Sequence, residues 1–133
     1  MFGTFQQSNL RIEVAAASNT IRESLIRPIN LRQWLWPQQL STGLPDQLIE
    51  NTQFTSRLGI VTVEHQVDQI TDNSLRLLLY GGIDGFHEWY WGEGWLQSQL
   101  EGVSLLPLNL GQTVTLLNLR RFLAVQSRDS QTA

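Results

Sequence analysis

Cysteine and lysine are both absent from this chain of 133 residues. Without cysteine, the protein has no disulfide, no thiol nucleophile and no thiolate metal ligand, a composition that fits a reducing compartment. Without lysine, a Schiff-base mechanism and a lysine-type phosphate loop are both excluded. All nine basic residues are therefore arginines.

A strong positive charge and long apolar runs are missing as well. The formal net charge is −3, from 9 basic and 12 acidic residues, and the arginines are scattered along the chain. No basic surface for a phosphate backbone is expected, so nucleic acid is not a predicted partner. The N-terminus lacks a basic region followed by an apolar run, and no segment approaches the roughly 18 apolar residues of a membrane-spanning helix. We expect no stable membrane insertion and a cytoplasmic location.

The hydrophobic content of 41% suits one domain with one core. A chain of this length buries about two thirds of the surface that its unfolded form exposes. The sequence shows no internal repeat and no linker. We expect a single domain over residues 1–126, followed by a polar and frayed tail over residues 127–133.

Alternation of apolar and polar residues predicts an antiparallel sheet. The clearest example runs from Val61 to Val67, where every second residue is apolar or histidine. Turn residues divide the pattern, and Gly59 is interpreted as a bulge inside one long strand. The predicted strands are six in number and cover residues 9–14, 47–50, 53–70, 74–80, 84–92 and 95–106.

Helices are predicted on either side of this meander. Thr20 and Glu23 form a candidate capping box for a short helix that Pro28 ends, and Asn30 is a candidate cap for a second short helix that ends before Pro37. From residue 109 to about 126 the apolar residues recur with the period of a helix. They predict a long helix with two apolar stripes. One stripe holds Leu110, Val114, Leu117 and Val125, and the other holds Leu116, Leu119 and Leu123. We therefore expect this helix to be buried on more than one side, against the sheet and against the short helices or a second subunit.

Three of the five tryptophans follow Gly82 within one short stretch. In a pleated strand, His87, Trp89 and Trp91 point to one face, and their neighbours Phe86, Glu88 and Tyr90 point to the other. Such a face either fills a core or forms the wall of a pocket, and both interpretations stay open. Trp95 has the opposite parity in the last strand and is predicted on the outer face or at an edge.

His65 and His87 both fall on predicted inner faces of their strands. A structural histidine with a satisfied hydrogen bond is the simpler interpretation, and the alternative is a polar anchor in an apolar cavity. Two histidines without cysteine match no metal-ligand spacing, so neither a metal nor a cofactor is predicted. Because adjacent strand residues face opposite ways, neither His87 with Glu88 nor His65 with Glu64 forms an acid–base pair on one substrate. We find no catalytic constellation.

The segment from Ile29 to Pro37, with its Trp34, resembles the part of the helix-grip superfamily where many members place a tryptophan after the first helix. Two further segments are similar to that superfamily. They are the strand that leads into Ala15-Ala16-Ala17-Ser18 and the strand that carries His65-Gln66-Val67. The order of elements resembles that superfamily, also called SRPBCC or START-like, over almost the whole chain. It includes lipid-transfer START domains, plant pathogenesis-related allergens, polyketide cyclases and Hsp90 activators.

The resemblance implies an α+β helix-grip fold, with a six-stranded antiparallel sheet curved around a long C-terminal helix and two short helices between strands one and two. It also implies a cavity for a hydrophobic or aromatic small molecule. A cyclase or dehydratase activity and an Hsp90-activator-like interaction domain remain as alternatives. A homodimer through Leu116, Leu119 and Leu123 is a further hypothesis. The predicted ligand-binding residues are Trp34, Trp36, Val63, His65, Leu77, His87, Trp89, Trp91, Ser98 and Leu117.

Overall fold

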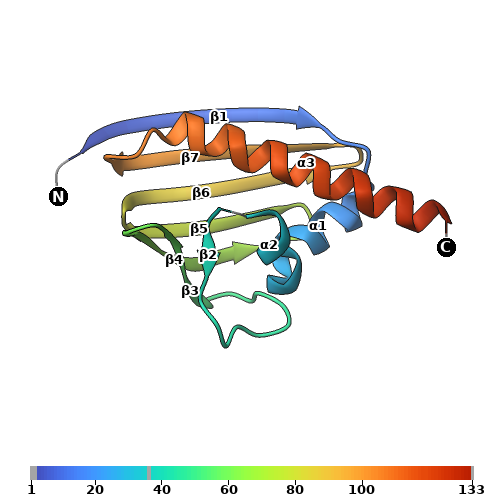
Figure 1. Cartoon of the computed structure of the whole chain (residues 1–133), viewed down its shortest axis with the longest axis horizontal. Helices are drawn as coiled ribbons and strands as arrows, with labels where there is room; N and C mark the ends of the chain where they lie inside the picture. The colour runs from blue at the N-terminus through green and yellow to red at the C-terminus, as the bar shows by residue number, and fades with distance from the viewer. Residues whose placement is uncertain (1–2, 36, 133) are drawn as a thin grey trace.

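The computed structural model describes residues 3–35 and 37–132, with side chains described up to Gln126. Strands and helices follow one another along the chain in an α+β order (Figure 1). They are β1 (Thr4–Glu13), α1 (Ser18–Ile26), α2 (Pro28–Trp34), β2 (Gln39–Leu40), β3 (Gln53–Leu58), β4 (Val61–Ile70), β5 (Ser74–Gly81), β6 (Ile83–Gly92), β7 (Trp95–Ser104) and α3 (Leu108–Thr132).

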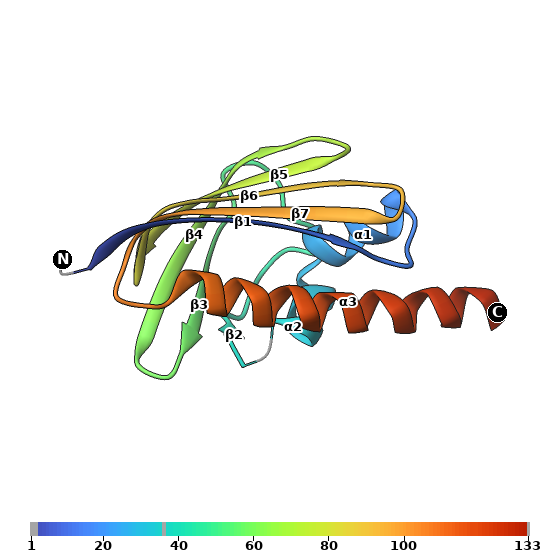
Figure 2. The ribbon, with the colours of Figure 1, turned by 90° about the horizontal axis from the view of Figure 1, so that it is seen from above.

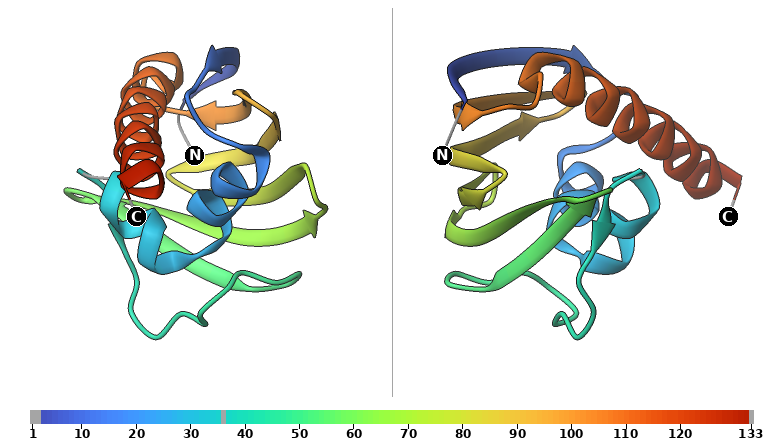
Figure 3. Two further views of the ribbon diagram at one scale, coloured as in Figure 1. Left: turned by 90° about the vertical axis from the view of Figure 1, so that its right-hand side faces the viewer. Right: turned by 60° about the vertical axis from the view of Figure 1, so that its left-hand side comes forward.

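The described strands form one antiparallel sheet in the order β1-β7-β6-β5-β4-β3-β2. The sheet is open, and β1 joins its far edge by pairing with β7. Figures 2 and 3 show α3 lying along one face of the curved sheet, with α1 and α2 closing one end. This arrangement confirms the α+β class, the antiparallel sheet, the two short helices after the first strand and the long C-terminal helix.

The sheet has seven strands, so the predicted number of six is wrong. The single strand predicted over residues 53–70 is a hairpin of β3 and β4, with Leu58 paired to Val61. Gly59 adopts a φ of 61° in the turn between them, a left-handed conformation that costs glycine little. The predicted strand over residues 47–50 is also wrong. Its Leu48 is buried and donates its N–H to the carbonyl of Ile26, and the short β2 pairs with β3 instead.

The ends of the helices also differ from the prediction. Helix α1 begins at Ser18 after an Ala17 cap that makes no side-chain hydrogen bond, so the capping box at Thr20 is wrong. Pro28 is the first residue of α2, where its missing N–H costs nothing. Helix α3 continues to Thr132, well past the predicted end at Gln126. The division into a domain over residues 1–126 and a tail over residues 127–133 stays a prediction.

Paired glycines let β6 and β7 approach closely at one end of the sheet. Gly85 lies opposite Gly102. A Cβ atom added to Gly85 would lie 1.9 Å from the carbonyl oxygen of Glu101, and one added to Gly102 would lie 2.6 Å from the carbonyl oxygen of Asp84. The backbone geometry at this pair therefore requires residues without a side chain.

The core lies between the sheet and the three helices. Ile21, Leu25 and Ile26 of α1 are buried. Helix α3 turns the stripe of Leu116, Leu119 and Leu123 inward, and each of these side chains is at most 2% exposed.

In the part of the chain that the structure describes, no helix is both long and apolar enough to cross a membrane. The cytoplasmic location stays a prediction.

Candidate functional site

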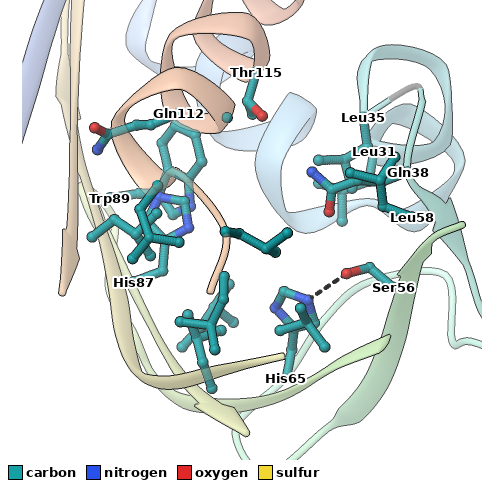
Figure 4. Close-up of a pocket in the computed structure, with 18 of the residues that line it drawn as sticks. Leu31, Leu35, Gln38, Ser56, Leu58, His65, His87, Trp89, Gln112 and Thr115 are labelled. Carbon is teal, nitrogen blue, oxygen red and sulfur yellow. Dashed lines mark hydrogen bonds between the residues drawn. The ribbon is translucent and has the colours of Figure 1, made fainter. Parts of the chain in front are cut away.

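A pocket of about 300 Å³ lies between the sheet and the helices. Most of its lining is aliphatic or aromatic, with leucines of β5, Trp34 of α2, Trp89 of β6 and the first turns of α3. Figure 4 shows His65 and His87 projecting toward this space from the sheet, while Leu31, Leu35 and Gln38 approach it from the other side. Leu58 and Leu110 line the pocket and are also exposed, so they mark its opening.

His65 is held by its two neighbours across the β3–β4 hairpin. Its Nε2 atom lies 2.9 Å from the hydroxyl oxygen of Ser56, as the dashed line in Figure 4 shows. Its ring stacks on Phe54, with centroids 4.5 Å apart and planes at 3°. The other ring nitrogen, Nδ1, is buried and has no hydrogen-bond partner. A buried polar atom without a partner is uncommon in a protein interior and calls for an explanation.

His87 occupies the adjacent part of the pocket wall. Its Nε2 atom lies 2.6 Å from the hydroxyl oxygen of Ser98, which faces it from β7. Its ring is tilted against the indole of Trp89, with centroids 4.5 Å apart. Both histidines are therefore positioned by a serine and by an aromatic ring, and both contribute an imidazole to a mostly apolar wall.

Burial keeps both imidazoles neutral. Removal from water lowers the pKa of His65 from 6.5 to about 4. The same desolvation, with a smaller repulsion from His65, lowers the pKa of His87 to about 3. Each ring therefore carries one proton on one of its two nitrogens at neutral pH, and the site offers hydrogen bonds without a charge.

A buried glutamine connects α3 to the wall behind His87, and the sequence analysis did not find it. The side chain of Gln112 bonds to Ser98 of β7 and to Ser8 of β1. A signal for it exists in the sequence. Gln112 occupies a position in the apolar stripe that Leu116 and Leu119 continue, and a polar residue in such a stripe requires a buried partner.

The aromatic residues of the wall are held from the helical side. Trp34 is buried, and its Nε1 donates a hydrogen bond of 2.9 Å to the carbonyl oxygen of Ser24 in α1. Its ring meets that of Trp89 edge to face, with centroids 6.0 Å apart. Trp34 therefore lies beside the pocket and joins α1, α2 and β6.

The predicted site residues divide into four groups. Six of them line the pocket, and they are Trp34, Val63, His65, Leu77, His87 and Trp89. Trp91 and Ser98 are buried but do not line it, so Trp91 belongs to the core and Ser98 lies behind His87. Leu117 is 46% exposed and does not line the pocket. Trp36 lies outside the described residues. The ligand-binding role of these residues stays a prediction.

Leu117 does not line the pocket, and the dimer contact through Leu116, Leu119 and Leu123 is wrong, for the same reason. Helix α3 presents that leucine stripe to the core, and the other stripe, with Leu110 and Leu117, is exposed. The sequence showed two apolar stripes but not which one packs on the sheet. A homodimer stays a prediction. Trp95 lies on the outer face, as predicted, where the guanidinium of Arg11 lies 4.3 Å from its ring centroid.

The carboxylates beside the histidines are on the other face of the sheet. Glu88 pairs with Arg76 and accepts a hydrogen bond from Tyr90, and this interaction raises the pKa of Tyr90. Within the described ranges, no group of three or more histidine, aspartate or glutamate side chains is placed to hold a metal ion.

Comparisons with known proteins establish the fold and no more. No family model and no curated protein matches the sequence. Protein CV1439 from Chromobacterium violaceum superimposes with a TM-score of 0.71 at 13% identity, over 88% of this chain and 96% of that one. The Aha1 dimer from Colwellia psychrerythraea gives a TM-score of 0.64 at 15% identity, over 89% of this chain and 96% of that one.

A third solved structure is DynU16, a protein of the dynemicin biosynthetic locus, with a TM-score of 0.66 at 15% identity. The match covers 89% of this chain but only 47% of DynU16, so this chain spans about half the length of that protein. The fold is helix-grip-like. At such low identities the likeness carries no function from one protein to another.

Proposed function

We propose that this protein binds a hydrophobic or aromatic small molecule, of a lipid-like or polyketide-like kind, in the pocket between its sheet and α3. The observation that carries the proposal is an apolar pocket of about 300 Å³ with two uncharged imidazoles in its wall. This volume is at the lower end for small-molecule sites, and sites of this kind combine apolar walls with a few polar groups that orient the ligand. A compact ligand of one or two rings fits this space best.

The pocket wall supports an aromatic ligand in particular. Trp34, His87 and Trp89 all line the pocket, and the indole of Trp34 meets that of Trp89 edge to face. Aromatic groups favour offset or edge-to-face contacts with one another, beyond the gain from burial alone. The protein acts in this proposal as a binding module, and the place of DynU16 in a biosynthetic locus agrees with a small-molecule ligand.

Native mass spectrometry of protein purified from its own host tests the proposal directly. We expect a co-purified apolar metabolite that is released on unfolding. Naphthalene is a suitable probe for calorimetric titration, because it has two rings and no polar group. The variant Val63→Phe fills the pocket and abolishes naphthalene binding, whereas Val103→Phe on the outer face of β7 leaves it unchanged. Equal naphthalene binding by the two variants would overturn the proposal.

The alternative is a cyclase or dehydratase in which a histidine moves a proton. Catalytic proton transfer is most efficient when the pKa of the group lies near the working pH. The lowered pKa values of His65 and His87 make both rings weak bases at neutral pH, so binding is favoured over catalysis. Turnover of a cyclisable substrate that is lost in His65→Gln and in His87→Gln would favour the enzyme instead.

A further inference from the structure

The side-chain amide of Gln112 has only one orientation that satisfies its surroundings. Its nitrogen, Nε2, lies 2.8 Å from the carbonyl oxygen of Ser98 and 3.2 Å from that of Ser8. Backbone carbonyls only accept hydrogen bonds, so the NH₂ group must face them and the amide oxygen must face away. That oxygen accepts the hydroxyl proton of Ser8, and Ser8 in turn accepts a hydrogen bond of 2.8 Å from Nδ2 of Asn109.

The orientation of Gln112 determines what Ser98 does. Nε2 of Gln112 also lies 2.9 Å from the hydroxyl oxygen of Ser98, which therefore accepts a hydrogen bond from the amide. Ser98 is fully buried, and Nε2 of His87 is the one remaining partner for its hydroxyl proton among the described residues. If His87 donated to Ser98 instead, that buried proton would have no acceptor, which is unfavourable.

Ser98 is consequently the donor, and Nε2 of His87 is the acceptor. A neutral imidazole carries its proton on one nitrogen, and the hydrogen bond made by one nitrogen decides which. The proton of His87 is therefore on Nδ1. Because His87 lines the pocket and this N–H has no partner among the described residues, it is a hydrogen-bond donor available at the pocket wall.

The same reasoning applies to His65 through a separate hydrogen bond. The hydroxyl of Ser56 is buried, and within the described part of the chain Nε2 of His65 is its one partner. Either tautomer of His65 leaves one buried donor unpaired, but the Nε2–H form would also leave Nδ1 as an unpaired acceptor, so Ser56 donates to Nε2 and His65 carries its proton on Nδ1. That atom is buried without an acceptor. Of the two histidines, only His87 therefore offers its N–H to the pocket, because Nδ1 of His65 is itself buried.

We infer that the hydrogen-bond chain from Asn109 through Ser8, Gln112 and Ser98 holds His87 as its Nδ1–H tautomer, so that the pocket selects apolar ring compounds that carry an acceptor oxygen, such as ketones and quinones. The ligand half of this inference rests on the proposed function, whereas the tautomer half does not. A ligand without an acceptor leaves the donor buried and unpaired, and sites of this kind discriminate strongly against such ligands.

The tautomers are measurable without any ligand. Long-range ¹H–¹⁵N correlation spectra of the ¹⁵N-labelled protein at pH 7.5 contain signals from two histidines only. We expect both rings to be Nδ1–H. The variant Ser98→Ala releases Nε2 of His87 and produces the Nε2–H form at His87 alone, and the matched variant Ser56→Ala does so at His65 alone. An Nε2–H tautomer of His87 in the wild-type protein, or no change of His87 in Ser98→Ala, would overturn the role of the chain.

The ligand class is tested with 1,4-naphthoquinone and naphthalene, which share a two-ring shape and differ in two carbonyl oxygens. The chain has no cysteine or lysine side chain for the quinone to alkylate. We expect His87→Phe to weaken naphthoquinone binding by about two- to tenfold, the range for one hydrogen bond, relative to its effect on naphthalene.

The two levels of the proposal fail in different ways. If His87→Phe changes the affinities for both probes by the same factor, the acceptor requirement is overturned and the apolar binding function stands. If neither probe binds the wild-type protein, the proposed function is overturned together with the ligand class. The spectra decide the tautomer in either case.

Discussion

The indole rings of Trp34 and Trp89 meet edge to face, with their centroids 6.0 Å apart and their planes at 78°. Trp34 comes from α2, and Trp89 comes from the aromatic strand β6. The contact joins the helical cover of the pocket to its wall. Trp89 lines the pocket and is still only 4% exposed, since the rings of Trp34 and His87 both pack against it.

Trp34 is expected to stabilise the fold more than Trp95 does. Truncation in Trp34→Ala removes a fully buried indole and its hydrogen bond to Ser24, and it should cost about 3 to 5 kcal/mol of unfolding free energy. Trp95→Ala removes a half-buried ring on the outer face and should cost clearly less. Urea denaturation measures both values. Equal losses would contradict the position of Trp34 as the link between α1, α2 and β6.

Trp89 and Trp91 lie on the same face of β6 and provide a matched comparison. Trp91 is 1% exposed and does not line the pocket, so Trp91→Ala should cost the full value of about 3 to 5 kcal/mol. Trp89 lines the pocket, where empty space takes the place of packed atoms, so Trp89→Ala should cost less than about 3 kcal/mol. A larger loss for Trp89 than for Trp91 in denaturant melts would place Trp89 in the core instead.

The buried histidines should make stability depend on pH above the range where most carboxylates titrate. Both have a pKa near 6.5 in the unfolded chain and lower values, about 4 and about 3, in the folded protein. Below pH 6.5 the unfolded state therefore binds more protons than the folded state. The free energy of unfolding therefore has its full value above about pH 6.5, and it decreases progressively as the pH falls toward 4.

The slope approaches about 1.4 kcal/mol per pH unit for each histidine well below pH 6.5, and between pH 6.5 and 5.5 the expected loss is about 1 kcal/mol for each. Urea melts at pH 7.5, 6.5 and 5.5 measure it. The double variant His65→Gln/His87→Gln should remove most of the decrease between pH 6.5 and 5.5. A wild-type stability that is flat over this interval would show that the imidazoles are not desolvated.

Gly85 is expected to tolerate no side chain. In Gly85→Ala the new Cβ would overlap the carbonyl oxygen of Glu101 at 1.9 Å, so β6 and β7 must separate and the unfolding midpoint should fall sharply. Gly111 in α3 is the matched control, because no atom lies within 4 Å of its added Cβ. Gly111→Ala should stabilise the protein by up to about 1 kcal/mol through its helix propensity. Similar thermal midpoints for the two variants would contradict the close approach of β6 and β7 at Gly85.

Local pattern predicts the parts of this fold that depend on neighbours in the chain. His65 and His87 face inward as predicted, because side chains alternate along a strand whatever the rest of the protein does. The short helix before Pro28 is present as predicted. The same parity placed Trp95 on the outer face. The hairpin at Gly59 was missed because a bulge and a tight turn both need one glycine, and the sequence alone does not distinguish them.

The sequence by itself determined an uncharged, apolar inner face with two histidines, and it excluded chemistry that needs cysteine or lysine. Only the tertiary structure decided which stripe of α3 packs on the sheet, since both stripes are apolar and the choice depends on the total area each can bury. It also decided the partners of the histidines. Ser8, Ser98 and Gln112 are far apart in the chain and meet only when α3 packs across β1 and β7. Once buried there, each polar atom must find a partner, and that requirement gives the pocket its donor.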